Sequence, residues 1–135
     1  MRAVQDAPDF AGFWIDYVEE PFMEGPIEPG GIIANVAFTT DVDPHAAGIR
    51  EIWGGPICLV QHERTYEELR RIQRELSDGA AAELGLEVTG SGVSQQDNRV
   101  EVGVVVASEA ALAAVDDRYG EGAVLLMPEL EPVPA

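Results

Sequence analysis

The second half of the chain repeats the order of elements found in the first half. Segments 31–61 and 101–127 both read as an apolar strand, a short Ala-rich helix, a Gly turn and a second apolar strand. At an offset of 66 residues (119 minus 53), Trp53-Gly54 aligns with Tyr119-Gly120. Such a repeat predicts an architecture, because similar units bury their apolar faces in similar ways. It predicts no chemistry by itself.

Periodicity gives each copy the order β-β-α-β, and a capped helix joins the two copies. Thr65-Tyr66-Glu67-Glu68 has the sequence of a capping box, and Leu69, Ile72 and Leu76 share one face of the helix 66–77 that follows. The expected strands are 10–17, 31–40, 57–61, 86–91 (or to 93), 100–106 and 123–127. The other expected helices are 44–53, capped by Asp43, and 109–119, capped by Ser108.

These elements predict an α+β fold of two β-β-α-β repeats joined by a helix, in one or two antiparallel-rich sheets with helices on one face. We expect a single domain over residues 1–135. Within it lie a first copy (10–64), a linking helix (65–79), a second copy (84–127) and an extended tail (128–135). Two further segments should lack regular structure: the polar start 1–9, which we expect to fray, and the acidic Pro-rich loop 19–30.

The charge of the chain narrows the classes of partner. The formal net charge is −17, from 25 acidic residues against 8 Arg and no Lys. The acids are spread over both halves, and a field of this sign repels phosphate backbones and anionic lipid. We therefore expect no nucleic-acid or membrane partner, and a protein partner would present a basic face. Solubility alone is an alternative explanation of the acidity.

Targeting and redox features are few. No basic segment followed by an apolar run opens the chain, so the sequence predicts no signal peptide, and a secreted protein that has lost its leader is the alternative. Cys58 is the only cysteine and cannot form an internal disulfide. Because it lies in the apolar run 57–60, we expect a buried side chain and no reactive thiolate.

Residues with catalytic or metal-binding chemistry form no complete constellation. Asp41, Asp43 and His45 alternate in a way that could supply metal ligands, but Asp43 is also expected to cap a helix. His62 follows a strand and has no nucleophile beside it in the sequence. We therefore predict no catalytic residues, no metal and no cofactor.

The strand 10–17 is rich in aromatic residues. Strand alternation puts Phe13, Ile15 and Tyr17 on one face and Trp14 on the other. Trp14 is thus a candidate anchor for a protein partner, because aromatic side chains are frequent at the centres of interfaces. The alternative is that Trp14 packs on a neighbouring element, as most large aromatic residues do.

With the copies aligned, the chain resembles the pro-regions of α-lytic-protease-type bacterial serine proteases. Phe13-Trp14-Ile15-Asp16, the capped helix at Thr65-Tyr66-Glu67-Glu68-Leu69, and the strand that follows Asp97-Asn98 carry the likeness, which spans most of residues 10–127. The acidic segment 19–30 departs from the pattern. The resemblance implies a secreted folding assistant that pairs an edge strand with its protease and inserts its C-terminal tail at the active site.

From these observations we predict a non-enzymatic protein-binding module, which acts as a folding assistant or inhibitor. Its partner would be a protease or another protein with a basic face. Two alternatives remain: a small-ligand binder or enzyme with a site between the copies near Trp53, His62 and Tyr119, and a structural or assembly subunit that pairs through sheet edges. The candidate partner-binding residues are Trp14, Leu126, Met127, Glu129, Leu130 and Val133.

Overall fold

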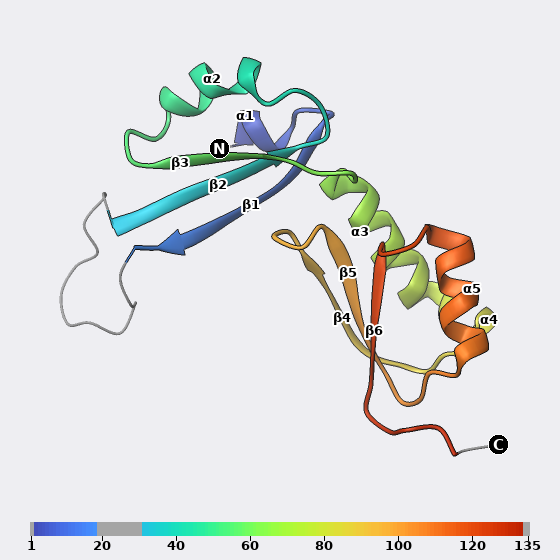
Figure 1. Cartoon of the computed structure of the whole chain (residues 1–135). Coiled ribbons are helices and arrows are strands. Elements are labelled where there is room, and N and C mark those ends of the chain that lie inside the picture. Colours follow the sequence, from blue (N-terminus) through green and yellow to red (C-terminus); the bar gives the residue numbers. More distant parts are fainter. Residues whose placement is uncertain (1, 19–30, 134–135) are drawn as a thin grey trace. The chain divides into compact units, whose positions relative to one another are not determined.

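Two three-stranded sheets make up the fold, and helices pack on each of them (Figure 1). This computed structural model describes residues 2–18 and 31–133. The chain divides into two compact units, Met1–Tyr66 (unit 1) and Glu67–Ala135 (unit 2). The buried apolar side chains form a separate cluster in each unit. The predicted α+β class with two similar sheet units is confirmed.

Unit 1 is a hairpin followed by a helical crossover to a third strand. Its strands, in the spatial order β1-β2-β3, are β1 (Phe10–Tyr17), β2 (Ile32–Phe38) and β3 (Ile57–Gln61). β1 is antiparallel to β2, and β2 is parallel to β3. A parallel pair needs a crossover connection, which a 3-10 turn (Asp43–His45) and the helix α2 (Ala46–Arg50) provide. A short helix, α1 (Arg2–Gln5), precedes β1.

Unit 2 repeats this topology and adds a helix in front of it. Its strands, in the order β4-β5-β6, are β4 (Val88–Ser94), β5 (Arg99–Val104) and β6 (Val124–Pro128). β4 and β5 form the antiparallel hairpin, and α5 (Glu109–Tyr119) crosses over to β6, which is parallel to β5. The Ser108 hydroxyl caps α5 as predicted, because its Oγ accepts a hydrogen bond from the Ala111 amide at 3.1 Å.

The helix that we expected to link the copies, α3 (Tyr66–Glu75), contributes to the core of unit 2. Leu69, Ile72 and Leu76 are each at most 2% exposed and belong to the same buried cluster as α5 and the second sheet. A π-helical turn follows, and Gly79 in it has φ +125°, a conformation that glycine adopts most readily. The chain changes direction there and continues into α4 (Ala81–Glu83).

Both sheets are mixed, with one antiparallel and one parallel strand pair each. The antiparallel hairpins are those expected from the β-β part of each repeat. The parallel pair follows from the α-β part, because a helix that crosses over one face brings the next strand back in the same direction. The helices α3 and α5 thus lie on the face of the second sheet formed by Val100, Val102 and Val104.

The strand registers show how closely the two units match. In unit 1, Phe10 pairs with Phe38 and the register then shifts, so that Gly12 pairs with Ala37. In unit 2, Val88 pairs with Val104 and the same shift follows. The β2 and β5 positions differ by 66 residues in each case (104 minus 38), the offset found in the sequence. Since a β-bulge is a specific device for bending a strand, its recurrence at the equivalent pair marks a structural repeat.

The main difference between the hairpins is the length of their connections. Asp16 pairs with Ile33, and the equivalent pair in unit 2 is Ser94 with Arg99. Sixteen residues (17–32) join the first pair and four (95–98) join the second, a difference of twelve. The acidic Pro-rich segment 19–30 falls in the longer connection and lies outside the described residues.

The two cores use equivalent positions. In unit 1 the fully buried cluster consists of Phe10, Val36, Phe38 and Ile49. By register and offset, the matching residues of unit 2 are Val88, Val102, Val104 and Val115, and all four belong to its core or pack against it. Each unit therefore buries the same side of its hairpin beneath its crossover helix.

Three local expectations were wrong in unit 1. Residues 2–9 do not fray, because Val4 and Ala7 pack against the Phe10 cluster. Asp43 does not cap the crossover helix with its side chain; instead Asp41 Oδ1 accepts a hydrogen bond from the Asp43 amide at 3.2 Å, an Asx-type turn. The α-helix itself ends at Arg50, three residues before the predicted end at Trp53.

Candidate functional site

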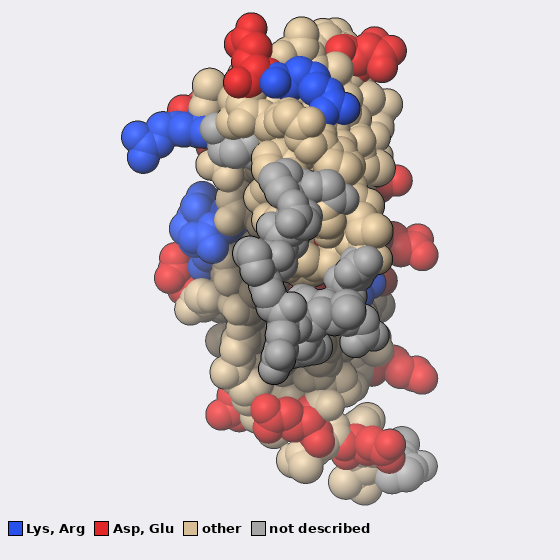
Figure 2. Space-filling model, turned by 90° about the vertical axis from the view of Figure 1, so that its left-hand side faces the viewer, with Lys and Arg blue, Asp and Glu red and all other residues tan. Residues whose placement is uncertain are grey.

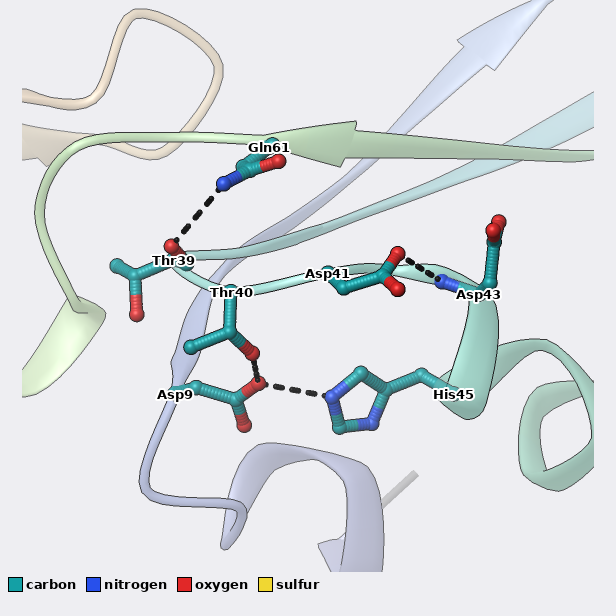
Figure 3. A network of polar contacts seen from close by, with 7 residues as sticks. All are labelled: Asp9, Thr39, Thr40, Asp41, Asp43, His45 and Gln61. Atoms are coloured by element: carbon teal, nitrogen blue, oxygen red, sulfur yellow. Dashed lines mark hydrogen bonds and ion pairs between the residues drawn. The ribbon is translucent and has the colours of Figure 1, made fainter.

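A polar network closes one end of the first sheet (Figure 3). Asp9 lies just before β1, and its Oδ2 accepts a hydrogen bond from the Thr40 hydroxyl at 2.5 Å. The same oxygen lies 2.8 Å from His45 Nε2, which donates because a carboxylate can only accept. The His45 ring also stacks on Phe38, with the ring centroids 3.7 Å apart and the planes 3° from parallel. The network ties the start of β1 to the end of β2 and to the crossover turn.

Electrostatics in this network favour the charged form of Asp9. Hydrogen bonding from Thr40 is the main cause that lowers the pKa of the Asp9 carboxyl, and His45 lowers it further against the opposing effect of burial. Thr40 donates to the carboxylate and not to the imidazole, so the three groups do not form the nucleophile–base–acid chain of a hydrolase. The arrangement fits a role in holding the fold.

Two of the residues weighed as metal ligands bond to other groups. His45 is bonded to Asp9, and the Asp41 carboxylate is bonded to the backbone amide of Asp43. Across residues 2–18 and 31–133, no three His, Cys, Asp or Glu side chains come close enough to hold a metal ion together.

An apolar groove opens on the helix-covered face of the first sheet. Its volume is about 180 Å³. Side chains of both hairpin strands form the floor, and the end of α2 with the turn after it forms a wall. The lining residues are Phe13, Ile15, Ile32, Ala34, Val36, Ile49, Ile52 and Trp53. Val36 and Ile49 are fully buried, whereas Ile15 and Ile52 are exposed at the rim, so the groove is open to solvent.

The second sheet has a different kind of surface on the face away from its helices. A shallow trough of about 350 Å³ runs over Gly90, Gly103 and Met127, which pair with one another across the three strands. Leu125 and Met127 stand on this face and are exposed. The small residues on β4 and β5 form the flat floor of the trough, and the large apolar residues on β6 form its edge.

β6 is an edge strand, since β5 is its only partner among the described strands. The Val100 amide donates to the Ala123 carbonyl, and the Glu129 amide donates to the Val104 carbonyl. Backbone groups alternate along a strand, so those of Val124 and Leu126 face away from β5. The open edge therefore offers hydrogen-bonding groups to an added strand.

The predicted partner-binding residues divide by exposure. Met127, Glu129, Leu130 and Val133 are exposed on β6 and the tail, as a binding segment requires. Leu126 differs: its side chain lies in the core of unit 2 and cannot touch a partner, which leaves only its backbone at the open edge.

The aromatic residues proposed as anchors or as a site between the copies each have partners within their own unit. Trp14 stacks on His62, with ring centroids 5.8 Å apart, so the alternative of packing on a neighbour holds for it. The Trp53 indole donates to the Pro56 carbonyl at 3.0 Å. Tyr119 packs against the core of unit 2, and burial raises the pKa of its hydroxyl. A site shared by the copies stays a prediction.

Charged side chains are distributed over the described surface, and one small group of them surrounds Arg99, which lies near Asp97 and Glu101. Acidic groups are scattered from top to bottom of the face drawn in Figure 2, in keeping with a net charge of −17 spread along the chain. Cys58 is exposed, so the expectation of a buried cysteine was wrong. It pairs with Asn35 on the face opposite to Ile57 and Leu59, which take the core positions of β3.

The sequence alone did not point to the groove or to Asp9. A signal for the groove was present in the repeat: the second copy follows an amphipathic helix, whereas only a short polar segment precedes the first. Asp9 carried no such signal, because one acid in a polar stretch has no pattern.

Comparisons with known proteins give no family for this chain. No protein-family model matches it, and no curated protein matches it significantly. The resemblance to protease pro-regions therefore still depends on the sequence motifs alone. In the described part of the chain, every helix is too short or too polar to cross a membrane.

Proposed function

We propose that this protein is a non-enzymatic protein-binding module, which engages its partner by strand addition at β6. The observation that carries the proposal is the open edge of β6, flanked by the exposed apolar side chains of Leu125 and Met127 and continued by an exposed tail. Edge strands of this kind bind an extended segment through the backbone, and neighbouring side chains supply specificity.

Two further features support a protease as the partner of a pro-region-like module. Glu129 and Glu131 make the tail acidic, which suits a partner with a basic face. The motif likeness to pro-regions of α-lytic-protease-type enzymes also implies a binding edge and an inserted tail at the C-terminal end of the chain. The proposed partner is therefore a serine protease of this type.

Binding to the mature domain of such a protease tests the proposal. Leu125→Glu places a charge at the binding edge and should weaken the affinity at least about tenfold, because a desolvated unpaired charge is costly. Leu112→Glu is the matched control: Leu112 is 43% exposed on α5 and Leu125 is 37% exposed. Titration calorimetry should show a loss only for Leu125→Glu.

Two results would contradict the proposal. One is the absence of saturable binding to the protease by the folded wild-type chain. The other is an equal affinity of Leu125→Glu and wild type, which would exclude β6 as the binding edge.

A further inference from the structure

The groove of unit 1 lies at the position of the repeat that α3 covers in unit 2. The floor residues Ala34 and Val36 correspond to Val100 and Val102 at the offset of 66, and Ile49 corresponds to Val115. In unit 2 these positions are fully buried within the cluster that also contains Leu69 and Ile72 of α3 and Leu76 of the π-helical turn that follows it. In unit 1 the same floor residues are at most 7% exposed, but Ile15 and Ile52 at the rim of the groove are open to solvent, whereas a helix covers the equivalent surface of unit 2.

Contacts of α3 fix its course over unit 2. Gln73 donates a hydrogen bond to Ser91 Oγ at 3.2 Å, and Ser91 is the register equivalent of Phe13. Arg71 and Glu75 lie close enough to Tyr119 to influence its hydroxyl, and Tyr119 is the equivalent of Trp53. In unit 1 both equivalent residues line the groove. α3 therefore runs over the place that corresponds to the groove.

The described residues of unit 1 provide no counterpart of α3. The helix before β1 is α1, which has four residues against ten in α3, and its Val4 packs near Phe10 and does not line the groove. The apolar rim residues Ile15 and Ile52 remain 43% and 47% exposed as a result. At the position equivalent to Ile52, unit 2 has Arg118, which forms an ion pair with Glu83 in α4.

We infer that the groove of unit 1 binds an amphipathic α-helix of a partner protein, seated as α3 is seated on unit 2. The helix would present large apolar side chains at the spacing of Leu69, Ile72 and Leu76, which is i, i+3, i+7. Residues 1–66 carry 11 acids against 3 Arg, so the outer face of the bound helix is basic. This surface is separate from β6 and the inference stands without the proposed protease.

A helical peptide tests the inference with the full chain. The probe is a 14-residue peptide with Leu, Ile and Leu at the α3 spacing and Lys at the outward positions; a peptide of the same composition with that spacing broken is its control. Two-dimensional NMR should show saturable shifts of the Trp53 indole and the Ile15 methyl groups with the first peptide and none with the second.

Rim variants locate the binding. Ile52→Glu should weaken peptide binding at least about tenfold, because the charge would be desolvated without a partner. Leu112→Glu, at a similarly exposed apolar residue of unit 2, should leave the affinity unchanged. Leu125→Glu should also leave it unchanged, which separates this site from the β6 edge.

Four outcomes would overturn the inference. They are equal binding of the two peptides, equal weakening by Ile52→Glu and Leu112→Glu, self-association of the chain that Ile52→Glu abolishes, and groove shifts with benzene but not with the helical peptide. The third outcome would assign the groove to a second copy, and the fourth to a small apolar ligand.

Discussion

At the scale of single residues, Asp9 makes the contacts on which the closed end of unit 1 depends. It accepts from Thr40 and from His45 through one carboxylate oxygen. Asp9→Ala removes both bonds and leaves two polar side chains without this acceptor. We expect a loss of about 1–3 kcal/mol in the free energy of unfolding. Urea denaturation at neutral pH measures it.

The pH dependence of this effect follows from the lowered pKa of Asp9. In the folded chain the carboxyl stays charged to lower pH than its unfolded value of about 3.9. Its contribution to stability is therefore fully present above about pH 4 and is lost as the pH falls through the folded pKa. The difference between wild type and Asp9→Ala should shrink accordingly. Asp6→Ala, at an exposed acid on the same segment, is the control; a loss equal to that of Asp9→Ala would contradict the role of Asp9.

Side-chain roles were the least predictable part of the sequence. Asp9 lay in a polar stretch whose composition resembles a frayed end, and only the fold brings Thr40 and His45 to it. Cys58 was assigned to the core because the run 57–60 is apolar throughout, and such a run does not reveal which strand face is buried. In both cases the missing information is tertiary: which element packs against which face.

At the scale of elements, the two crossover helices differ in how they begin. Ser108 caps α5 with its side chain, whereas Asp43 makes no side-chain cap bond at the start of the first crossover. Ser108→Ala should therefore cost about 1 kcal/mol in the free energy of unfolding, the usual value for a lost N-cap. Asp43→Ala, next to Val42 at the position equivalent to Ser108, should cost much less because Asp43 makes no cap bond. Thermal denaturation of both variants measures the contrast, and a larger loss for Asp43→Ala would show that the cap assignment is wrong.

The elements themselves were largely predictable, for a physical reason. Alternating Val residues define β5, and the stripe Leu69, Ile72 and Leu76 predicts the helix that begins at Tyr66, so local pattern and final burial agree in these segments. In β1 the burial instead decreases along the strand from Phe10 to Tyr17. The open groove could not be read in the same way. The groove is open because, among the described residues of unit 1, no helix equivalent to α3 covers it. The periodicity of a segment does not indicate whether another segment covers its apolar face.

At the scale of the whole molecule, the repeat predicts that the loop of one hairpin can replace the loop of the other without a change in strand register. The pairs Asp16 with Ile33 and Ser94 with Arg99 are equivalent, and the register shift follows at the same distance from each, although the first hairpin continues for one more pair, Tyr17 with Ile32. The longer connection of unit 1 is thus an addition to a hairpin that needs only four residues to close. Asn98 has φ +55° in the short connection, a left-handed conformation that Asn tolerates well.

Replacing residues 17–32 by Gln-Gln-Asp-Asn, the sequence of 95–98, tests this equivalence. The shorter loop lowers the entropy of the unfolded chain, which should stabilise unit 1 by about 1 kcal/mol on loop closure alone. Loss of Ile32 removes part of the apolar floor and acts in the opposite direction, so the net change should be small. Amide exchange should show that β1 and β2 stay protected, and inter-strand nuclear Overhauser contacts should show that Phe10 still pairs with Phe38. A control loop of four Gly residues should be less stable, because Gly loses more conformational entropy on folding than other residues do. If the grafted chain loses the protection of β1 and β2 while unit 2 keeps its own, the hairpins are not interchangeable, and the long connection takes part in forming the first sheet.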